Sequence, residues 1–383
     1  MTWIRLCLIV LYCSGIVAAT PPPPDRQAVA DLTERGGDWL LSRQQADGSW
    51  GSVAVTALVV DALVGPDGTG AERPALQRAL DHLLSFQHPD GGIYSPEEGL
   101  GTYCTSFTLL VLGRLPDGHP AADTQVITAA QDYLRGCQRD VGVDAGGFGY
   151  DQGKGEADLA NTASAIAALR ASGVPGDDPA MQRALAFVER CQNLSSHNDQ
   201  TWSGNDGSAA YRPEPGSGSW TEGDGGQPAR AAAARNPGYG GMTYALIASY
   251  VYLDLAPTDP RLATAQDWVR KNYQFDANPG MTTGRENEGL FYYFMTMAKT
   301  FGLLGVTTVA LPDGRVVDWR ADLFQAISAK AKAVALPGEN QGALWINSSK
   351  RWMEGDPLVA TAFMVKGLSR IQSSLAQEGE QDD

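Results

Sequence analysis

The sequence predicts an all-α fold, a closed ring of six helical hairpins of the kind called an α/α-toroid. Two observations lead to this prediction. A short motif of an aromatic residue, an aliphatic residue and, after three further residues, a glutamine recurs along the chain. An amphipathic segment precedes each copy, and a segment that is apolar nearly all round follows it. Such repeating pairs bury their apolar faces only by stacking on one another.

The motif is most complete at its first copy, which reads Arg35-Gly36, Trp39-Leu40, Gln44 and Gly48-Ser49-Trp50. Its glutamine returns as Gln87, Gln138 and Gln192, each in the same register with an aromatic-aliphatic pair. A fifth copy is degenerate, with Trp268-Val269 followed by Tyr273, and a sixth around Ile327 keeps only the helical pattern. We expect the repeat residues to be structural, with glutamines bonded near outer-helix ends: Gln44, Trp50, Gln87, Gln138 and Gln192.

The segments on either side of the motif predict two kinds of helix. Before it, apolar residues such as Leu76, Ala79, Leu80 and Leu83 share one face, as expected of an outer helix. After it come segments that are apolar all round and must be buried, at 56–60, 105–110, 162–169, 243–252, 291–304 and 361–368. The pairs Asp178-Pro179, Asp259-Pro260 and Asp356-Pro357 read as helix starts, each with a capping carboxylate and a first-turn proline. Six such pairs suffice to close a ring.

The repeats resemble the "QW" repeats of squalene-hopene cyclases, which share the α/α-toroid with protein prenyltransferase β-subunits. The resemblance covers roughly residues 30 to 370 and is strongest between Arg35 and Trp50. It implies a squalene cyclase/prenyltransferase-like toroid with a central cavity, entered at the mouth where the inner helices begin.

The 383 residues read as one repeat domain with distinct ends. Residues 1–19 have the positive charge, apolar stretch and small residues of a cleaved signal peptide, so we expect a secreted or periplasmic protein without a stable membrane anchor. We assign 20–29 as a proline-rich spacer, 30–372 as the toroid and 373–383 as an acidic tail. A Gly/Pro/Ala-rich insertion at 204–241 breaks the period, and is either a mobile surface loop or a lid.

The net charge limits the kinds of partner that the protein can bind, and the cysteine content predicts the state of its thiols. A formal charge of -15 and a pI near 4.7 argue against nucleic acid as a partner. Three cysteines remain after the predicted signal: Cys104, Cys137 and Cys191. Cys137 and Cys191 hold equivalent repeat sites, which packed helices keep too far apart for a disulfide, so we expect free, buried thiols. The oligomeric state is left open.

The mouth of the ring concentrates the residues that could carry chemistry. Carboxylate candidates are Asp158, Glu288 and Asp356, although Asp158 and Asp356 could equally cap helix N-termini. The other residues expected there are Tyr103, Cys104, Asn161, Tyr239, Met242, Tyr292, Tyr293 and Glu354.

The residues that define the activities of the resembled families are missing. Squalene-hopene-type cyclases carry Asp-x-Asp-Asp-Thr-Ala, whose central Asp protonates an alkene. The corresponding segment here begins at Asp158 and ends in Thr162-Ala163, and Ala160 stands at the acid position. The resemblance to zinc prenyltransferases implies Asp-x-Cys plus a distant histidine, but Thr102, Arg135 and Glu189 precede the cysteines by two positions. We therefore expect no metal and no cofactor.

Two function classes remain from the sequence. One is a protein that binds an apolar or polymeric ligand in the toroid cavity. The other is an enzyme of different chemistry, either a carbohydrate-active enzyme using two carboxylates or a divergent terpenoid cyclase. Facing carboxyl groups in an open groove would favour hydrolysis, whereas an aromatic-lined enclosure without an acid would favour apolar binding.

The sequence predicts that the purified protein does not cyclise squalene. Alkene protonation needs a strong acid in a water-excluded pocket, and Ala160 removes the matching donor. Asp158 lies two residues earlier, about 200° around an ideal helix, and should point elsewhere. Incubation of wild type and Asp158→Asn with squalene, followed by analysis for polycyclic products, tests this. Product from wild type alone would establish Asp158 as a cyclase acid.

Overall fold

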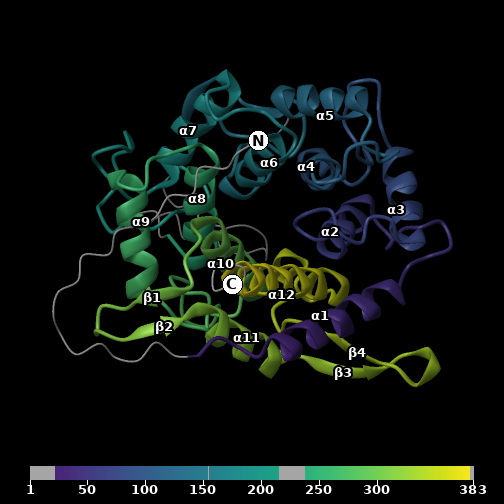
Figure 1. Cartoon of the computed structure of the whole chain (residues 1–383). Helices are drawn as coiled ribbons and strands as arrows, with labels where there is room; N and C mark the ends of the chain where they lie inside the picture. The colour runs from purple at the N-terminus through teal and green to yellow at the C-terminus, as the bar shows by residue number, and fades with distance from the viewer. Residues whose placement is uncertain (1–21, 154, 215–237, 380–383) are drawn as a thin grey trace.

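The computed structural model describes residues 22–153, 155–214 and 238–379, and shows the predicted closed ring of helical hairpins. Six helices form its outer layer: α1 (Arg26–Leu41), α3 (Pro74–Leu84), α5 (Thr124–Cys137), α7 (Pro179–Cys191), α9 (Pro260–Lys271) and α11 (Trp319–Lys330). Six alternate with them inside: α2 (Val53–Leu63), α4 (Gly101–Leu112), α6 (Leu159–Ala171), α8 (Gly240–Tyr252), α10 (Leu290–Leu304) and α12 (Pro357–Gly379). Figure 1 shows the inner helices surrounding the middle of the ring.

The inner helices contact one another in chain order, and α12 returns to α2, so the ring closes without a free end. At the closure, α1 lies against α12 because Gly36 has no side chain. A Cβ there would come within 2.7 Å of Val365 Cγ2 and 3.2 Å of the Trp345 ring. Lys366 of α12 also forms an ion pair with Asp61 of α2 across the same junction. The all-α prediction of a six-hairpin toroid is confirmed.

Two short antiparallel hairpins flank α11, outside the ring of inner helices. One pairs β1 (Thr308–Ala310) with β2 (Val316–Asp318), and the other pairs β3 (Lys332–Ala335) with β4 (Gln341–Leu344). Strand β4 packs on α1 and leads into Trp345. The remaining short elements are 3-10 turns at Gly142–Asp144, Pro337–Glu339 and Arg351–Met353.

The repeat glutamines link neighbouring outer helices. Gln44, Gln138 and Gln192 donate from their side-chain amides to the carbonyls of Ala75, Ala180 and Arg261, at 2.7 to 2.8 Å. Each acceptor is the second residue of the next outer helix, directly after a proline. In the degenerate fifth copy the Tyr273 hydroxyl takes this place and donates to Asp322 of α11 at 3.0 Å. The structural assignment of these glutamines is therefore supported by their contacts.

Gln87 departs from that expectation. Its side chain is exposed, and within the described part of the chain it makes no side-chain hydrogen bond. The outer helix it would reach, α5, begins at Thr124 after the Asp123 cap and, unlike α3, α7 and α9, has no first-turn proline. The expected bond of Gln87 near an outer-helix end is thus wrong.

Trp50 anchors the turn between α1 and α2 to the end of α1. It is buried, and its indole N–H donates to the Leu40 carbonyl at 2.7 Å. Trp345 does the same in the sixth repeat, where its indole N–H donates to the Ile327 carbonyl at 2.9 Å. The sixth copy therefore keeps its tryptophan, which the sequence comparison of the repeats missed because the β3–β4 hairpin displaces it from its usual spacing.

Three boundaries differ from those expected. Helix α1 begins inside the assigned spacer because Asp25 caps it by accepting from the Ala28 amide. Helix α12 continues through most of the assigned acidic tail, since Leu375 is buried and Glu378 pairs with Arg320. The insertion is also narrower than 204–241, because residues 204–214 form a packed turn and α8 begins at Gly240. Residues 215–237 and the predicted signal lie outside the described residues.

The three cysteines are free and buried, as predicted. Burial raises the pKa of each thiol above its usual range, so these side chains pack as small apolar groups and not as reactive thiolates.

The glutamine contacts predict a sharp difference between two chemically identical substitutions. Gln138→Ala removes the buried amide that donates to Gly146 and Ala180, leaving two carbonyls without that donor. We expect a loss of about 1–3 kcal/mol in the free energy of unfolding. Gln87→Ala, at the exposed copy, should change it by less than about 0.5 kcal/mol. Urea denaturation of both variants measures this, and equal losses would contradict the structural assignment.

Candidate functional site

The six inner helices begin on one side of the ring, and we call their N-terminal ends with the turns before them the mouth. Four of these helices are capped by a side chain from the turn of the next repeat. Glu98 accepts from the Val53 and Ala54 amides of α2 at 2.7 and 3.0 Å, and Asp151 accepts from Gly101 of α4 at 2.9 Å. Asn278 and Glu354 cap α8 and α10 in the same way. These polar groups hold repeats together by satisfying free helix N–H groups.

Asp158 caps its own helix, α6, and is almost completely buried. Its Oδ1 accepts from the Asn161 amide at 2.8 Å and its Oδ2 from the Asn161 side chain at 2.7 Å. A hydrogen bond from Tyr211 reaches the same carboxyl group. Burial raises the pKa of Asp158 to about 6, although the hydrogen bonds from Asn161 and Tyr211 oppose that rise.

Tyrosine side chains surround this acid. The hydroxyls of Tyr150 and Tyr211 lie 3.0 Å apart, which extends the hydrogen-bonded chain outward from Asp158. Burial raises the pKa of Tyr103 well above its usual range, and the neighbouring Asp158, Tyr150, Tyr292 and Tyr239 add to that effect. We call the set the aromatic cluster: Tyr103, Tyr150, Tyr211, Tyr239, Tyr292, Trp352, Phe107 and Phe363. Ring contacts of 5.8 to 6.3 Å pair Tyr103 with Phe107 and Tyr150, Tyr239 with Trp352, and Tyr292 with Phe363.

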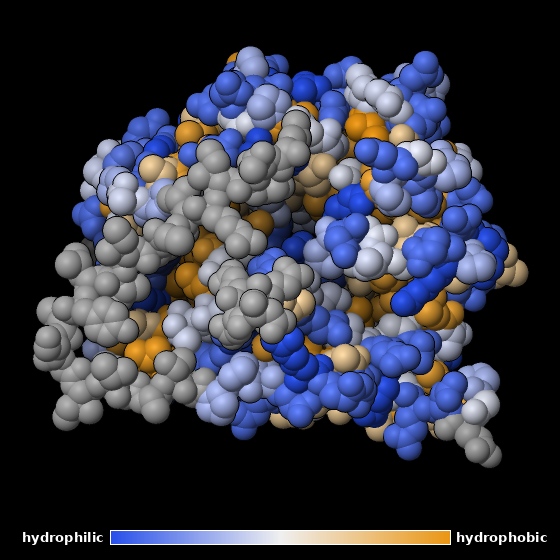
Figure 2. Space-filling view, in the orientation of Figure 1, coloured by the Kyte–Doolittle hydropathy of each residue, from blue (hydrophilic) through white to orange (hydrophobic). Residues whose placement is uncertain are grey.

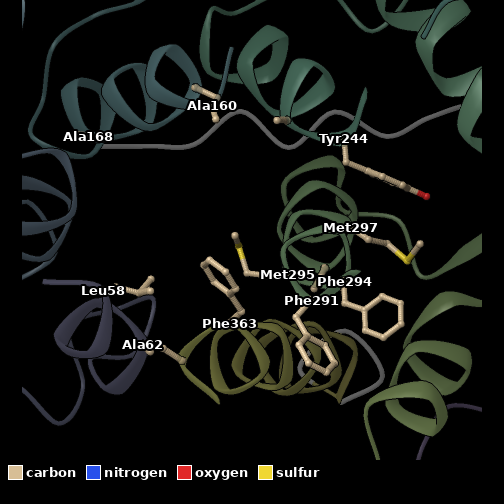
Figure 3. Packing of buried hydrophobic residues seen from close by; sticks show 14 of the residues in the cluster. Leu58, Ala62, Ala160, Ala168, Tyr244, Phe291, Phe294, Met295, Met297 and Phe363 are labelled. Carbon is tan, nitrogen blue, oxygen red and sulfur yellow. The ribbon is translucent and has the colours of Figure 1, made fainter. Parts of the chain in front are cut away.

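The inner wall of the ring is apolar. Figure 3 shows Leu58, Ala160, Met295 and Phe363 pointing from four inner helices toward the middle of the ring. Figure 2 shows the surface hollowed near the middle of the same view, with apolar and polar residues around it. At the cyclase acid position the wall therefore carries the Ala160 methyl, and Asp158 lies apart from it at the helix cap.

The other two carboxylate candidates are engaged elsewhere. Glu288 is held by Arg285 at 2.8 and 2.9 Å and lies 3.4 Å from Arg351. Asp356 accepts from the Leu358 amide at 2.8 Å and so caps α12. Glu354 is fully buried, and burial raises its pKa to about 7 against the hydrogen bonds from Tyr292, Asn347 and Phe291. Each of the three carboxyl groups is thus held by arginines or by the N–H groups of a helix start.

Several expected mouth residues do line the site and others do not. Tyr103, Asn161, Tyr239 and Tyr292 gather around Asp158. The placement of Tyr293 is wrong, because it lies about 100° around α10 from Tyr292 and its hydroxyl donates to the Gln274 carbonyl at 2.8 Å. Cys104 and Met242 are buried core residues.

The sequence reasoning missed Tyr150, Tyr211 and Trp352. Each lies in the turn that precedes an inner helix, at a variable distance from its first residue. Every such turn contains an aromatic residue, and this pattern could have pointed to them. Because the turns differ in length, the aromatic residues do not recur at a fixed spacing along the chain.

Comparisons with known proteins agree with this fold. The family model described as the squalene-hopene cyclase N-terminal domain matches residues 76–198. The resemblance to squalene cyclases is confirmed. No curated protein matches the chain in sequence.

Solved structures with very different activities share the toroid. The type II terpene cyclase MstE from Scytonema has a TM-score of 0.54 at 14% identity, with 92% of this chain and 100% of that chain covered. An α-1,6-mannanase from Salegentibacter scores 0.52 at 12% identity, covering 90% and 99%. An unsaturated glucuronyl hydrolase mutant from Streptococcus agalactiae scores 0.52 at 11%, covering 91% and 93%. At such identities the likeness establishes the fold alone.

The described residues contain no group of three or more His, Cys, Asp or Glu side chains placed to hold a metal ion. Among the helices in that part of the chain, none has both the length and the apolar character that a membrane crossing requires.

The raised pKa of Asp158 predicts a pH-dependent stability difference. Between about pH 4 and 6 the unfolded chain releases this proton while the folded protein retains it, so the free energy of unfolding falls as pH rises. The shift corresponds to about 3 kcal/mol at most. Asp158→Asn should lose this component, so the stability of wild type relative to the variant should decline from pH 4 to 6.5. Denaturation of both proteins across that range measures the difference, with Glu354 titrating equally in each. Parallel stability curves would contradict the assignment.

Proposed function

We propose that this protein binds a largely apolar ligand with one polar group, held inside the ring and entering through the mouth. The observation that carries the proposal is the aromatic cluster around one buried acid, above an apolar inner wall. Ligand sites of this type combine an apolar enclosure with a few placed polar groups. The chain of Tyr150, Tyr211 and Asp158 would receive a hydroxyl or carbonyl of the ligand.

The same arrangement of side chains does not favour cyclase activity. Ala160 presents a methyl group where the resemblance to squalene-hopene cyclases calls for the acid. Asp158 accepts hydrogen bonds on both oxygens, and a pKa near 6 makes it a weak acid for protonating an alkene. Asp158 therefore serves as a cap and as a polar contact for the ligand.

A carbohydrate-active enzyme has less support. Such chemistry uses two carboxyl groups on either side of the scissile bond. Glu288 is bound by two arginines, while Asp356 and Glu354 cap helices, so these carboxyl groups already have partners. The apolar inner wall also favours an apolar ligand over a polar polymer.

Export is part of the proposal. Residues 1–19 have the features of a cleaved signal, and the mature chain would begin near Thr20. An exported carrier would take up its ligand outside the cytoplasm.

Native mass spectrometry of the protein, purified from an exporting host and followed by solvent extraction, tests the proposal. We expect a copurifying apolar compound, and the intact mass reports whether the first 19 residues have been removed. A titration with geranylgeraniol, which has an apolar body and one hydroxyl, should quench the fluorescence of tryptophans near the mouth such as Trp352.

A matched pair of variants locates the ligand. Ala160→Phe fills the middle of the ring and should weaken geranylgeraniol binding about tenfold or more, since a bulky ring would occupy the ligand's space. Ala263→Phe adds the same ring on the exposed face of outer helix α9 and should bind as wild type does. Melting temperatures of both variants verify folding. Undiminished binding in a folded Ala160→Phe would refute the location, and no binding by wild type would refute the proposed ligand class.

A further inference from the structure

A second pocket opens within the ring, among residues at or near the C-terminal ends of α2, α4 and α8 and side chains from the middle of α10 and α12. The pocket together with its opening to solvent comprises about 360 Å³ of space not occupied by atoms. Because five of the six inner helices contribute to its wall, the pocket lies at the ring axis. Its charged lining consists of Asp61, Arg114, Lys299, Lys366 and Arg370, with Leu110, Tyr252 and Met295 completing the wall.

Asp61 forms ion pairs with two of these four cationic side chains. It lies 2.6 Å from Arg114 and forms an ion pair with Lys366. Burial alone would raise the pKa of Asp61, but Lys366 and Arg114 outweigh it and hold the pKa at about 2. The carboxylate is therefore ionised across the physiological range and offsets one positive charge.

Lys299 and Arg370 have no such partner. Within the described ranges, neither side chain forms an ion pair, and the Lys299 ammonium lies 5.1 Å from the centre of the Tyr252 ring. Burial and the neighbouring Arg370 and Arg114 together lower the pKa of Lys299 to about 8, although Asp61 opposes that shift. Four cations against one carboxylate leave three positive charges in excess, in a chain whose formal charge is -15.

Neutralisation of helix dipoles does not account for this excess. Each helix C-terminus carries about half a negative charge, so the ends of α2, α4 and α8 supply about 1.5 in total. That effect also fades within the last turn, whereas Lys299 lies in the middle of α10 and Lys366 in the middle of α12. Uncompensated buried charge destabilises a fold unless something binds it.

We propose that this pocket, the basic pocket, binds a small multivalent oxyanion of the phosphate class, either free or as the head group of an organic phosphate. Arg114 and Arg370 contribute forked guanidinium donors to the lining, and Lys299 adds a point charge next to the Tyr252 ring. A phosphate, with about −1.5 to −2 charges, would offset at least half of the excess and a pyrophosphate more, whereas a single carboxylate would leave most of it. The basic pocket adjoins the aromatic cluster, since the Lys366 ammonium lies 5.1 Å from the centre of the Phe107 ring. Its charged side chains take no part in the function proposed there, so the two proposals stand separately.

Isothermal titration of the full-length protein with inorganic phosphate, pyrophosphate and n-octyl phosphate, at constant ionic strength in sodium chloride, tests the proposal. We expect binding of at least one probe and a matching rise in melting temperature. Stronger binding of pyrophosphate would identify a free anion as the natural type of ligand. Stronger binding of n-octyl phosphate would identify an organic phosphate.

Two variants and one control locate the anion. Lys299→Met and Arg370→Gln each remove one unpaired cation and should weaken binding about tenfold or more, because hydrogen bonds to charged groups contribute strongly. Lys332→Met removes the same charge from an exposed position on β3 and should bind as wild type does. Without anion, Lys299→Met should melt at or above the wild-type temperature, which distinguishes lost affinity from misfolding. Absence of binding by wild type to all three probes, or equal binding by Lys299→Met, would overturn the proposal.

Discussion

The same type of hydrogen bond recurs around the ring and holds a turn to the inner helix that follows it. In five of the six repeats a threonine in the first turns of the inner helix accepts from a buried backbone N–H of the turn before it, at 2.9 to 3.1 Å. The donor and acceptor pairs are Trp50 with Thr56, Ile93 with Thr105, Phe148 with Thr162, Ala209 with Thr243, and Trp345 with Thr361. A buried N–H must find a partner, and this bond provides one while fixing where the next helix starts.

The positions at which the inner helices begin determine which N–H groups the acidic side chains at the mouth accept from. Parallel inner helices present their free N–H groups on the same side, and Glu98, Asp151 and Glu354 reach across from neighbouring repeats to accept from them. Carboxylates at such positions stabilise the helix dipole and join the repeats. Acidic residues at the mouth are therefore mostly committed to holding the ring together, and the side chains left to meet a ligand are tyrosines and tryptophan.

The two ends of the ring consequently differ in chemistry. At the mouth, aromatic rings surround one acid whose pKa burial raises to about 6. Toward the other end, cations exceed carboxylates and Asp61 stays ionised. The apolar wall that includes Met295 and Phe363 lies along the interior. Similar toroids in a terpene cyclase and in two sugar-acting enzymes show that the scaffold itself leaves such choices open.

The sequence by itself determined the toroid, the alternation of outer and inner helices, and the free buried cysteines, because local periodicity and repeat register express helix type and burial. It also placed Asp158 in the mouth and showed that Ala160 replaces the cyclase acid. Only the tertiary structure decided which side chains meet: the Tyr150 and Tyr211 hydroxyls come from different turns and lie 3.0 Å apart, with Tyr211 next to Asp158. Likewise, Lys366 and Asp61 join two helices although they are 305 residues apart. Turns of unequal length and the closure of the ring bring these groups together, and neither effect leaves a fixed spacing along the chain.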